Sequence, residues 1–398
     1  MMDVQSIAAI VFVLLLALLL YLNRQQLQIQ KIFFPLLYVV MYRTKIGIPS
    51  MDTISKRFPK TLKWLGYTGI VVGFIGMVAI AVSLLHNLYN LIFVPAAVSG
   101  VGIVQPFAKD IPGTFFVPFF YFIISIFVLV IVHEFSHGVL ARLYGLDIKS
   151  SGLAFLGVIA PILPAAFVEP DEKKLVKRPV KEQLSIFAAG PFSNILVALL
   201  IVAVVFFAVN PLVSGIVEYQ GVQVTGFAEK DGGKYPAEFA GMQKGELVTV
   251  IDNTPITTVE NFTSLLGAKK PGDAITIVTN VSSYTVTLTN NPTDTEKPYM
   301  GIYVGQSTKI KESFEQKYGT WLAPVILWLA GLLLWMYVLN VGIGLFNLLP
   351  IPICDGGRMF QLVCQKLFEK ERAQKVWKNV GIFFILLILV NLFLGFAK

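Results

Sequence analysis

Long apolar runs dominate the pattern of this chain. An α-helix needs about 20 mostly apolar residues to cross the hydrocarbon core of a bilayer. Runs of that kind lie at 6–22, 64–85, 115–140, 183–209, 321–346 and 379–397. The pattern therefore predicts a polytopic α-helical membrane protein with six transmembrane helices. A further apolar run, 32–41, is too short to span and is interrupted by Pro35, so we expect it in the interface or beside the helix bundle.

The stretch 211–320 has a different pattern. Apolar and polar residues alternate, with the period of half-buried strands, at 221–225, 246–251, 274–279 and 283–289. We therefore expect an inserted β-rich domain of about 95 residues. The expected organisation is a first anchor with its cytosolic link (1–63), a membrane core (64–210), the inserted domain (211–320) and a C-terminal membrane core (321–398).

The composition agrees with a membrane protein and excludes a soluble globular one. Hydrophobic residues make up 55% of the chain, charged residues only 14%, and the mean hydropathy is +0.71. In such a chain the net charge of +8 reflects topology, so we expect no nucleic-acid partner.

The basic residues predict the orientation. The links 23–63, 141–182 and 347–380 carry eight, seven and six Lys or Arg, whereas the link 86–114 carries only Lys109. Because basic links stay in the cytosol, both termini and the inserted domain should be extracytoplasmic. The expected location is the cell membrane, with several passes through the lipid bilayer.

The segment His133-Glu134-Phe135-Ser136-His137, at the end of the third run, carries the main chemical signal. Two histidines four residues apart share one face of a helix, so both imidazoles can bind one Zn²⁺. Glu134, about 100° around the helix axis, can face an activated water as the general base. The alternative is a hydrogen-bonded pair of core histidines, but ionisable groups within a span are costly and usually functional.

A catalytic zinc keeps three protein ligands and one open position, so a third ligand is needed. Asp355 is the acidic candidate near the start of a cytosolic link. The prolines before it end the fifth helix, and Gly356 and Gly357 let the backbone turn sharply, so the carboxylate can stay close to the membrane. The alternative is a solvated Asp355 that caps a helix over 357–367. The expected metal centre is one Zn²⁺ per chain, on His133, His137 and Asp355, towards the cytosolic side.

The apolar segment 150–170 follows the zinc helix and is interrupted by two glycines and two prolines. We expect a re-entrant segment that can pair with an unwound substrate strand; an interfacial loop is the alternative.

These motifs resemble those of the site-2 proteases, the intramembrane zinc metalloproteases of peptidase family M50. The first family motif is matched by His133-Glu134-x-x-His137 and the second by Asn347-x-x-Pro350-x-Pro352-x-x-Asp355-Gly356. Gly190-Pro191-Phe192-Ser193-Asn194 is similar to a further family element, and 236–256 closely resembles the helix, turn and strand of a PDZ domain. A single inserted PDZ domain is usual in one branch of the family.

The resemblance implies an endopeptidase that cuts single-span membrane proteins within or near the membrane, after an earlier extracytoplasmic cut. Glu134 is then the base, and Asn194 or Asn347 can donate a hydrogen bond to the developing oxyanion. For Asn194 the alternative is that it ties two helices together. The PDZ-like domain is expected to bind a peptide C-terminus or to act as a size filter. A zinc transporter and a catalytically silent membrane adaptor are the competing functions.

Overall fold

The computed structural model describes residues 4–33, 37–94, 99–106, 111, 113–158, 160–228, 233–292 and 294–397. Contacts divide the chain into two compact units. The first unit takes its residues from 1–93, 98–205 and 330–398, and most of the second is 206–329. All six predicted site residues belong to the first unit.

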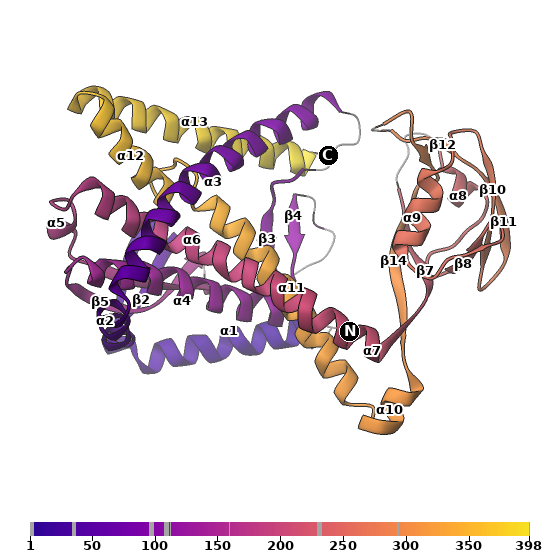
Figure 1. Ribbon diagram of the computed structural model, residues 1–398, viewed down its shortest axis with the longest axis horizontal. Coiled ribbons are helices and arrows are strands. Elements are labelled where there is room, and N and C mark those ends of the chain that lie inside the picture. The colour runs from indigo at the N-terminus through magenta and orange to yellow at the C-terminus, as the bar shows by residue number, and fades with distance from the viewer. Residues whose placement is uncertain are drawn as a thin grey trace. The chain divides into compact units, whose positions relative to one another are not determined.

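The first unit is built mainly from helices (Figure 1). Its helices are α1 (Val4–Leu22), α2 (Ile48–Arg57), α3 (Pro59–Phe93), α4 (Phe119–Leu143), α5 (Glu172–Leu175), α6 (Val180–Val204), most of α11 (Leu322–Phe346), α12 (Asp355–Leu367) and α13 (Lys370–Ala397). A short parallel pair, β3 (Ile103–Gln105) and β4 (Thr114–Phe116), precedes α4. Helix α6 continues through a π-helical turn, 205–209, into α7 (Asn210–Ile216).

Among the described residues, five helices are long and apolar enough to cross a membrane. They are Pro59–Phe93, Phe119–Leu143, Val180–Ile216, Leu322–Phe346 and Lys370–Phe396. These five correspond to the last five predicted runs. The apolar part of α1, Ile7–Leu22, is shorter than the length required, so the sixth crossing stays a prediction.

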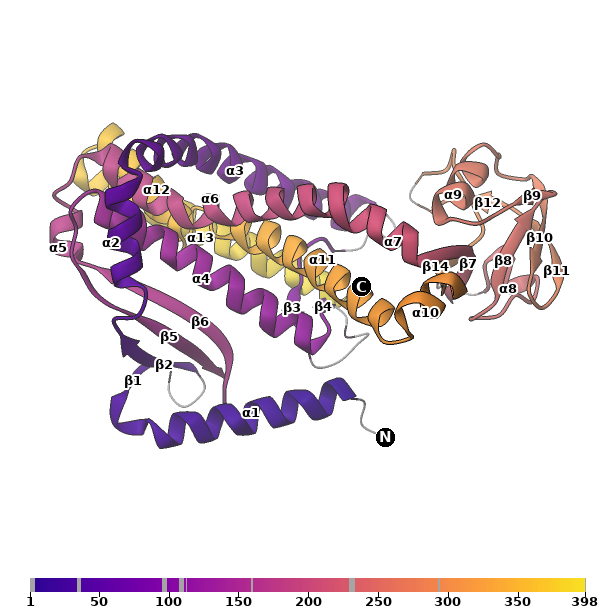
Figure 2. The same ribbon diagram turned by 60° about the horizontal axis from the view of Figure 1, so that its bottom comes forward.

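A four-stranded antiparallel sheet lies beside α4 (Figure 2). Its strands pair in the order β1 (Leu27–Phe33), β2 (Leu37–Thr44), β5 (Ile148–Val158) and β6 (Ala160–Pro170). The described residues of the segment 150–170 therefore form two paired antiparallel strands, and the described part of the run 32–41 belongs to the strands beside them. Because β5 is hydrogen-bonded by β2 on one side and β6 on the other, its backbone groups are satisfied without a helix. β6 is an edge strand that runs along α4.

Helix α3 approaches the segment that connects α11 to α12 very closely. A Cβ on Gly73 would lie 2.9 Å from Cε of Met359, and one on Gly76 would lie 2.5 Å from Cδ1 of Leu348. Both neighbours are fully buried. The absence of a side chain at Gly73 and Gly76 thus lets Leu348 in the connecting segment and Met359 in α12 pack directly against α3.

The start of α12 is fixed by contact between two stretches of backbone. A Cβ on Gly356 would lie 2.0 Å from the carbonyl oxygen of Leu348, and one on Gly357 would lie 1.9 Å from that of Ile351. The Gly356 N–H donates to the Asn347 carbonyl oxygen at 2.8 Å. Both glycines lie in the first turn of α12, so they permit close backbone packing and not the sharp turn expected from the sequence.

The second unit contains a six-stranded sheet and short helices. The sheet follows the path β11 (Ser283–Thr287), β10 (Ala274–Thr279), β8 (Leu247–Ile251), β7 (Val217–Phe227) and β14 (Ile302–Ile310), with β9 (Thr254–Pro255) beside β8. The remaining elements are α8 (Pro236–Phe239), α9 (Val259–Gly267), α10 (Glu312–Tyr318) and the pair β12 (Thr289–Asn290) and β13 (Pro298–Tyr299). All four predicted strands are present, and the helix, turn and strand of 236–256 have the PDZ-like order α8, β8, β9. β14 is an edge strand, and α9 packs near it.

Candidate metal centre and active site

Helix α4 presents the two histidines of the first motif on one face. Their Nε2 atoms lie 3.2 Å apart, and His133 is buried. The spacing follows from the 3.6-residue period of the helix, which stacks positions four apart. Both rings therefore direct a nitrogen at the same point.

Asp355, the first residue of α12, completes this cluster. Its Oδ2 lies 3.1 Å from Nε2 of His133 and 3.3 Å from Nε2 of His137. Cys354 occupies the N-cap position and no side chain caps α12, so Asp355 does not serve as the helix cap. The structure thus brings together two ligand positions from α4 and one from a segment 222 residues away in sequence.

The donor atoms fit a tetrahedral zinc. Ligand atoms bound at about 2.0–2.1 Å in tetrahedral geometry stand about 3.3 Å from one another. The three observed separations, 3.1, 3.2 and 3.3 Å, agree with that spacing. Among the described residues, this His-His-Asp group has the donor types and convergence of a metal site, with all three atoms within 4.8 Å of one another.

The charge state of Asp355 also suits a metal ligand. Burial opposes its ionisation, but positive charge on the imidazoles of His137 and His133 outweighs burial and holds the pKa of the carboxyl well below its ordinary value; a metal ion bound at the same point would supply that positive charge instead. The carboxylate is therefore ionised at neutral pH, as a ligand must be.

The outer nitrogen of His137 fixes its tautomer. Nδ1 lies 2.7 Å from the carbonyl oxygen of Ile186 on α6, and a carbonyl can only accept. Nδ1 therefore carries the proton and donates it, which leaves the Nε2 lone pair free for a metal. Hydrogen bonds of this kind orient histidine ligands in metalloproteins.

Asn194, also on α6, contacts the outer nitrogen of His133. Its Nδ2 is placed 3.2 Å from Nδ1 of His133, while its Oδ1 is buried without a hydrogen-bond partner among the described residues. Oxygen and nitrogen of an amide are assigned by their partners. Turning this amide places Oδ1 where it accepts from a protonated Nδ1, which removes the unpaired oxygen and again frees Nε2. The geometry favours a positioning role for Asn194 over contact with an oxyanion.

Gly190 lets α6 come close to the two histidines predicted to bind the metal. A Cβ at this position would lie 2.4 Å from Nε2 of His137 and 2.5 Å from Nε2 of His133. Any side chain would therefore displace the two ligand atoms or push α6 away. The functional role of Gly190 was not predicted, although it opens the Gly-Pro-x-x-Asn element.

Glu134 faces a cavity of about 370 Å³ that also contains both histidines and Asp355. Its Oε2 accepts the N–H of Val168 on β6 at 3.0 Å. The carboxylate also borders a second, mostly apolar cavity of about 300 Å³ between α4 and the sheet. Glu134 thus stands between the metal ligands and the edge strand.

Two further polar residues line the first cavity. Asn347, directly after α11, lies among its walls as a candidate donor to an oxyanion. Arg358, one turn along α12 from Asp355, adds a permanent positive charge that sequence reasoning missed. Its guanidinium carbon lies 5.5 Å from the Phe187 ring centroid, and its Nη2 lies 3.7 Å from Oε1 of Glu172. The sequence did contain one indication: Arg358 lies three residues after the proposed ligand Asp355, a spacing that places both on the same face of a helix.

Comparison with known proteins agrees with this geometry. The family described as "Peptidase family M50" matches residues 121–388, which include every residue of the cluster. The chain belongs to peptidase family M50. This confirms the resemblance noted in the sequence, and with the apolar helices it indicates a membrane metalloprotease, for which zinc is the expected ion.

Relatives of this M50 chain occur in archaea and bacteria. "Uncharacterized protein MJ0971" of Methanocaldococcus jannaschii is 25% identical over 347 residues, 85% of this chain and 80% of its own length. "Putative zinc metalloprotease SA1105" of Staphylococcus aureus is 25% identical over 264 residues, 54% of this chain and 59% of its own length. A solved PDZ domain from a Listeria monocytogenes SdrC-like protein is 27% identical, covers 22% of this chain and 88% of its own, and has a TM-score of 0.19.

Removing the carboxylate ligand should empty the centre. We expect about one zinc per purified wild-type chain and a clear loss in Asp355→Ala, because two imidazoles alone leave a catalytic zinc one protein ligand short. Elemental analysis of protein purified without chelator measures this. Equal zinc in both proteins would exclude Asp355 as a ligand.

A methyl group on Gly190 should also weaken the centre. Gly190→Ala places Cβ against both ligand nitrogens, so zinc affinity should fall about tenfold or more, as when ligand-orienting contacts are lost. Competition with a zinc chelator gives the affinity. The matched control is Gly342→Ala on α11, where a Cβ meets no atom within 4 Å. Equal affinities in the two variants would contradict the close-approach argument.

Proposed function

We propose that this protein is an intramembrane zinc endopeptidase that hydrolyses peptide bonds of single-span membrane proteins within or near the membrane. The observation that carries the proposal is the placement of Glu134 beside a three-ligand cluster in one cavity, on a helix able to span a bilayer. A silent adaptor has no need of such a carboxylate. A zinc transporter needs polar groups along several spans, whereas here the ligands gather at one end of α4 and in one link.

The chemistry of hydrolysis follows from the groups that line the cavity. Zinc, when bound by His133, His137 and Asp355, supplies Lewis acidity toward a water and a substrate carbonyl. Glu134 takes a proton from the attacking water and returns it to the amine that leaves. Asn347 donates to the carbonyl oxygen as negative charge develops there. His137 and His133 stay oriented by Ile186 and Asn194.

The substrate must be presented as an extended strand, because a helix engages its own carbonyls in hydrogen bonds. The edge of β6 that faces α4 offers such a template. Since the Val168 N–H points to Glu134, the N–H of Ala166, two residues away, points to the same free edge. The neighbouring positions on this edge offer no free donor: Pro164 and Pro170 have no N–H, and the Val168 N–H is bonded to Glu134. Ala166 therefore supplies an N–H donor on this edge that pairing with β5 does not use. Ala165 and Ala166, which line the cavity, also leave room for substrate side chains.

The second unit is proposed to act on substrates before they reach the zinc. A free strand edge at β14 beside α9 is the arrangement in which PDZ domains add a peptide as an extra strand. The ligand would be a C-terminus made by an earlier extracytoplasmic cut; a size filter is the other use of the domain. The proposed location is a multi-pass protein of the cell membrane, with this unit outside and the zinc towards the cytosol.

The base is tested by Glu134→Gln, which keeps the shape of the side chain but cannot take a proton. Cleavage of a single-span reporter trimmed on its extracytoplasmic side should fall at least ~100-fold, with zinc content unchanged. Glu371→Gln, at an exposed position of α13 that does not line the cavity, is the control. Retained cleavage by the Glu134 variant would remove this residue from the mechanism.

The edge strand is tested by Ala166→Pro, which removes the free N–H without touching the pairing to β5. Cleavage of the same reporter should fall on the order of tenfold, the cost of one lost hydrogen bond. Ala166→Gly retains the donor and is the matched control, and zinc content reports that each variant has kept its site. If the proline and glycine variants cleave equally, the substrate does not pair with β6 at this residue.

A further inference from the structure

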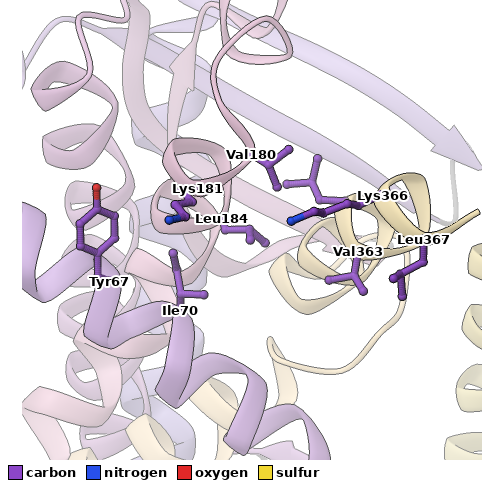
Figure 3. Close-up of a pocket in the computed structure, with 9 residues that line it drawn as sticks. Tyr67, Ile70, Val180, Lys181, Leu184, Val363, Lys366 and Leu367 are labelled. Carbon is purple, nitrogen blue, oxygen red and sulfur yellow. The ribbon is translucent and has the colours of Figure 1, made fainter.

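A third cavity in the first unit, larger than the two that border Glu134, lies apart from the metal centre. It has a volume of about 600 Å³ and is bounded by three helices: Tyr67 and Ile70 on α3, Lys181 and Leu184 on α6, and Val363 and Lys366 on α12 (Figure 3). None of its lining residues lines the cavity that contains Glu134. The proposed protease mechanism makes no use of it.

The lining combines apolar walls with two positive charges. Ile70, Leu184 and Val363 provide apolar surface, and no acidic residue is among the residues that bound the cavity. Neither Lys181 nor Lys366 forms an ion pair within the described part of the chain. Figure 3 shows Lys366 extending from α12 towards α6, the helix that carries Lys181. The cavity therefore carries two positive charges that no acidic lining residue neutralises. The rest of its lining is apolar and suits a hydrocarbon chain.

The position of the cavity along the helices is that of a membrane interface. Tyr67 lies one turn after Lys63 near the start of the span of α3, and Lys181 lies in the first turn of α6. Tyrosine and lysine at the ends of spans are the residues that contact lipid headgroups. Tyr67 is 47% exposed, so its hydroxyl can reach a ligand.

We propose that this cavity binds an anionic phospholipid, with its phosphate between Lys181 and Lys366 and the first part of an acyl chain against the apolar wall. Charge complementarity selects an anion, and the apolar wall selects a lipid over free phosphate. The lipid would connect α6, which carries Gly190 and Asn194, to α12, which begins with Asp355. It would thereby hold together two helices that build the metal centre.

Native mass spectrometry of the full chain tests the proposal without reference to protease activity. The probes are phosphatidylglycerol, phosphatidylcholine with the same acyl chains, and inorganic phosphate. Wild type should retain phosphatidylglycerol in preference to phosphatidylcholine. Retention should fall tenfold or more in the double variant Lys181→Gln with Lys366→Gln, since each lysine near a headgroup contributes to anion binding.

The matched control removes the same charge elsewhere: Lys177→Gln with Lys375→Gln, both at exposed positions that do not line the cavity. This control should retain the lipid. Equal loss in the two double variants would show a general charge effect and overturn the site. Equal retention of the two lipids by wild type would overturn the role of the phosphate charge.

A third variant tests the acyl chain. Val363→Trp fills the apolar part of the cavity and keeps both lysines, so phosphatidylglycerol should be lost although the charge is unchanged. Retention by this variant, or displacement of the lipid from wild type by inorganic phosphate, would reduce the site to a surface phosphate contact and contradict the proposal.

Discussion

The convergence of two imidazole nitrogens and one carboxylate on a single point is the interaction on which the rest of the first unit depends. Three lone-pair donors held 3.1–3.3 Å apart repel one another unless a cation lies between them. Burial strengthens that repulsion, because little water screens it. The surrounding protein must therefore fix each donor, and most of the contacts around the cluster do so.

The supporting contacts are arranged in two layers. Ile186 and Asn194, both on α6, hold the outer nitrogens of the histidines. Around them, close helix packing depends on missing side chains: Gly190 brings α6 to the ligands, and Gly356 brings the start of α12 against Leu348. Within a bilayer, helices gain little from the hydrophobic effect when they associate, so close packing at small residues is a principal source of their stability. The metal centre and the helix interfaces thus share the same glycines.

The edge strand β6 gives the site its second property. A strand with a free edge is a hazard in most proteins, because it can pair with any extended chain. Here the exposed edge runs along α4 beside the proposed base, and the Val168 N–H is already bonded to the Glu134 carboxylate. An extended substrate that paired with this edge, as proposed, would compete for that N–H and free the carboxylate. Substrate binding and release of the base would then be one event.

Local patterns in the sequence were sufficient for much of this protein. The five long spans, the alternating strands of the second unit and the His133-Glu134-x-x-His137 motif could all be predicted, because hydrophobic period and helical spacing depend on neighbours within a few residues. Asp355 could be proposed as the third ligand because prolines end the preceding helix and because the metal needs one more donor. Asn347, named as a possible donor to the oxyanion, lines the cavity that contains Glu134, and its catalytic role stays a prediction.

Only the tertiary structure decided the remainder. The described residues of the run 32–41 and of the segment 150–170 belong to one sheet, which no local period indicates, since strand pairing joins residues more than a hundred positions apart. The roles of Gly190 and of the glycines after Asp355 depend on the distance between two packed backbones, a quantity that residue type alone does not contain. Asn194 faces His133 and Arg358 enters the cavity because α6, α4 and α12 meet there. Sequence fixes which groups are present, whereas packing decides which of them touch.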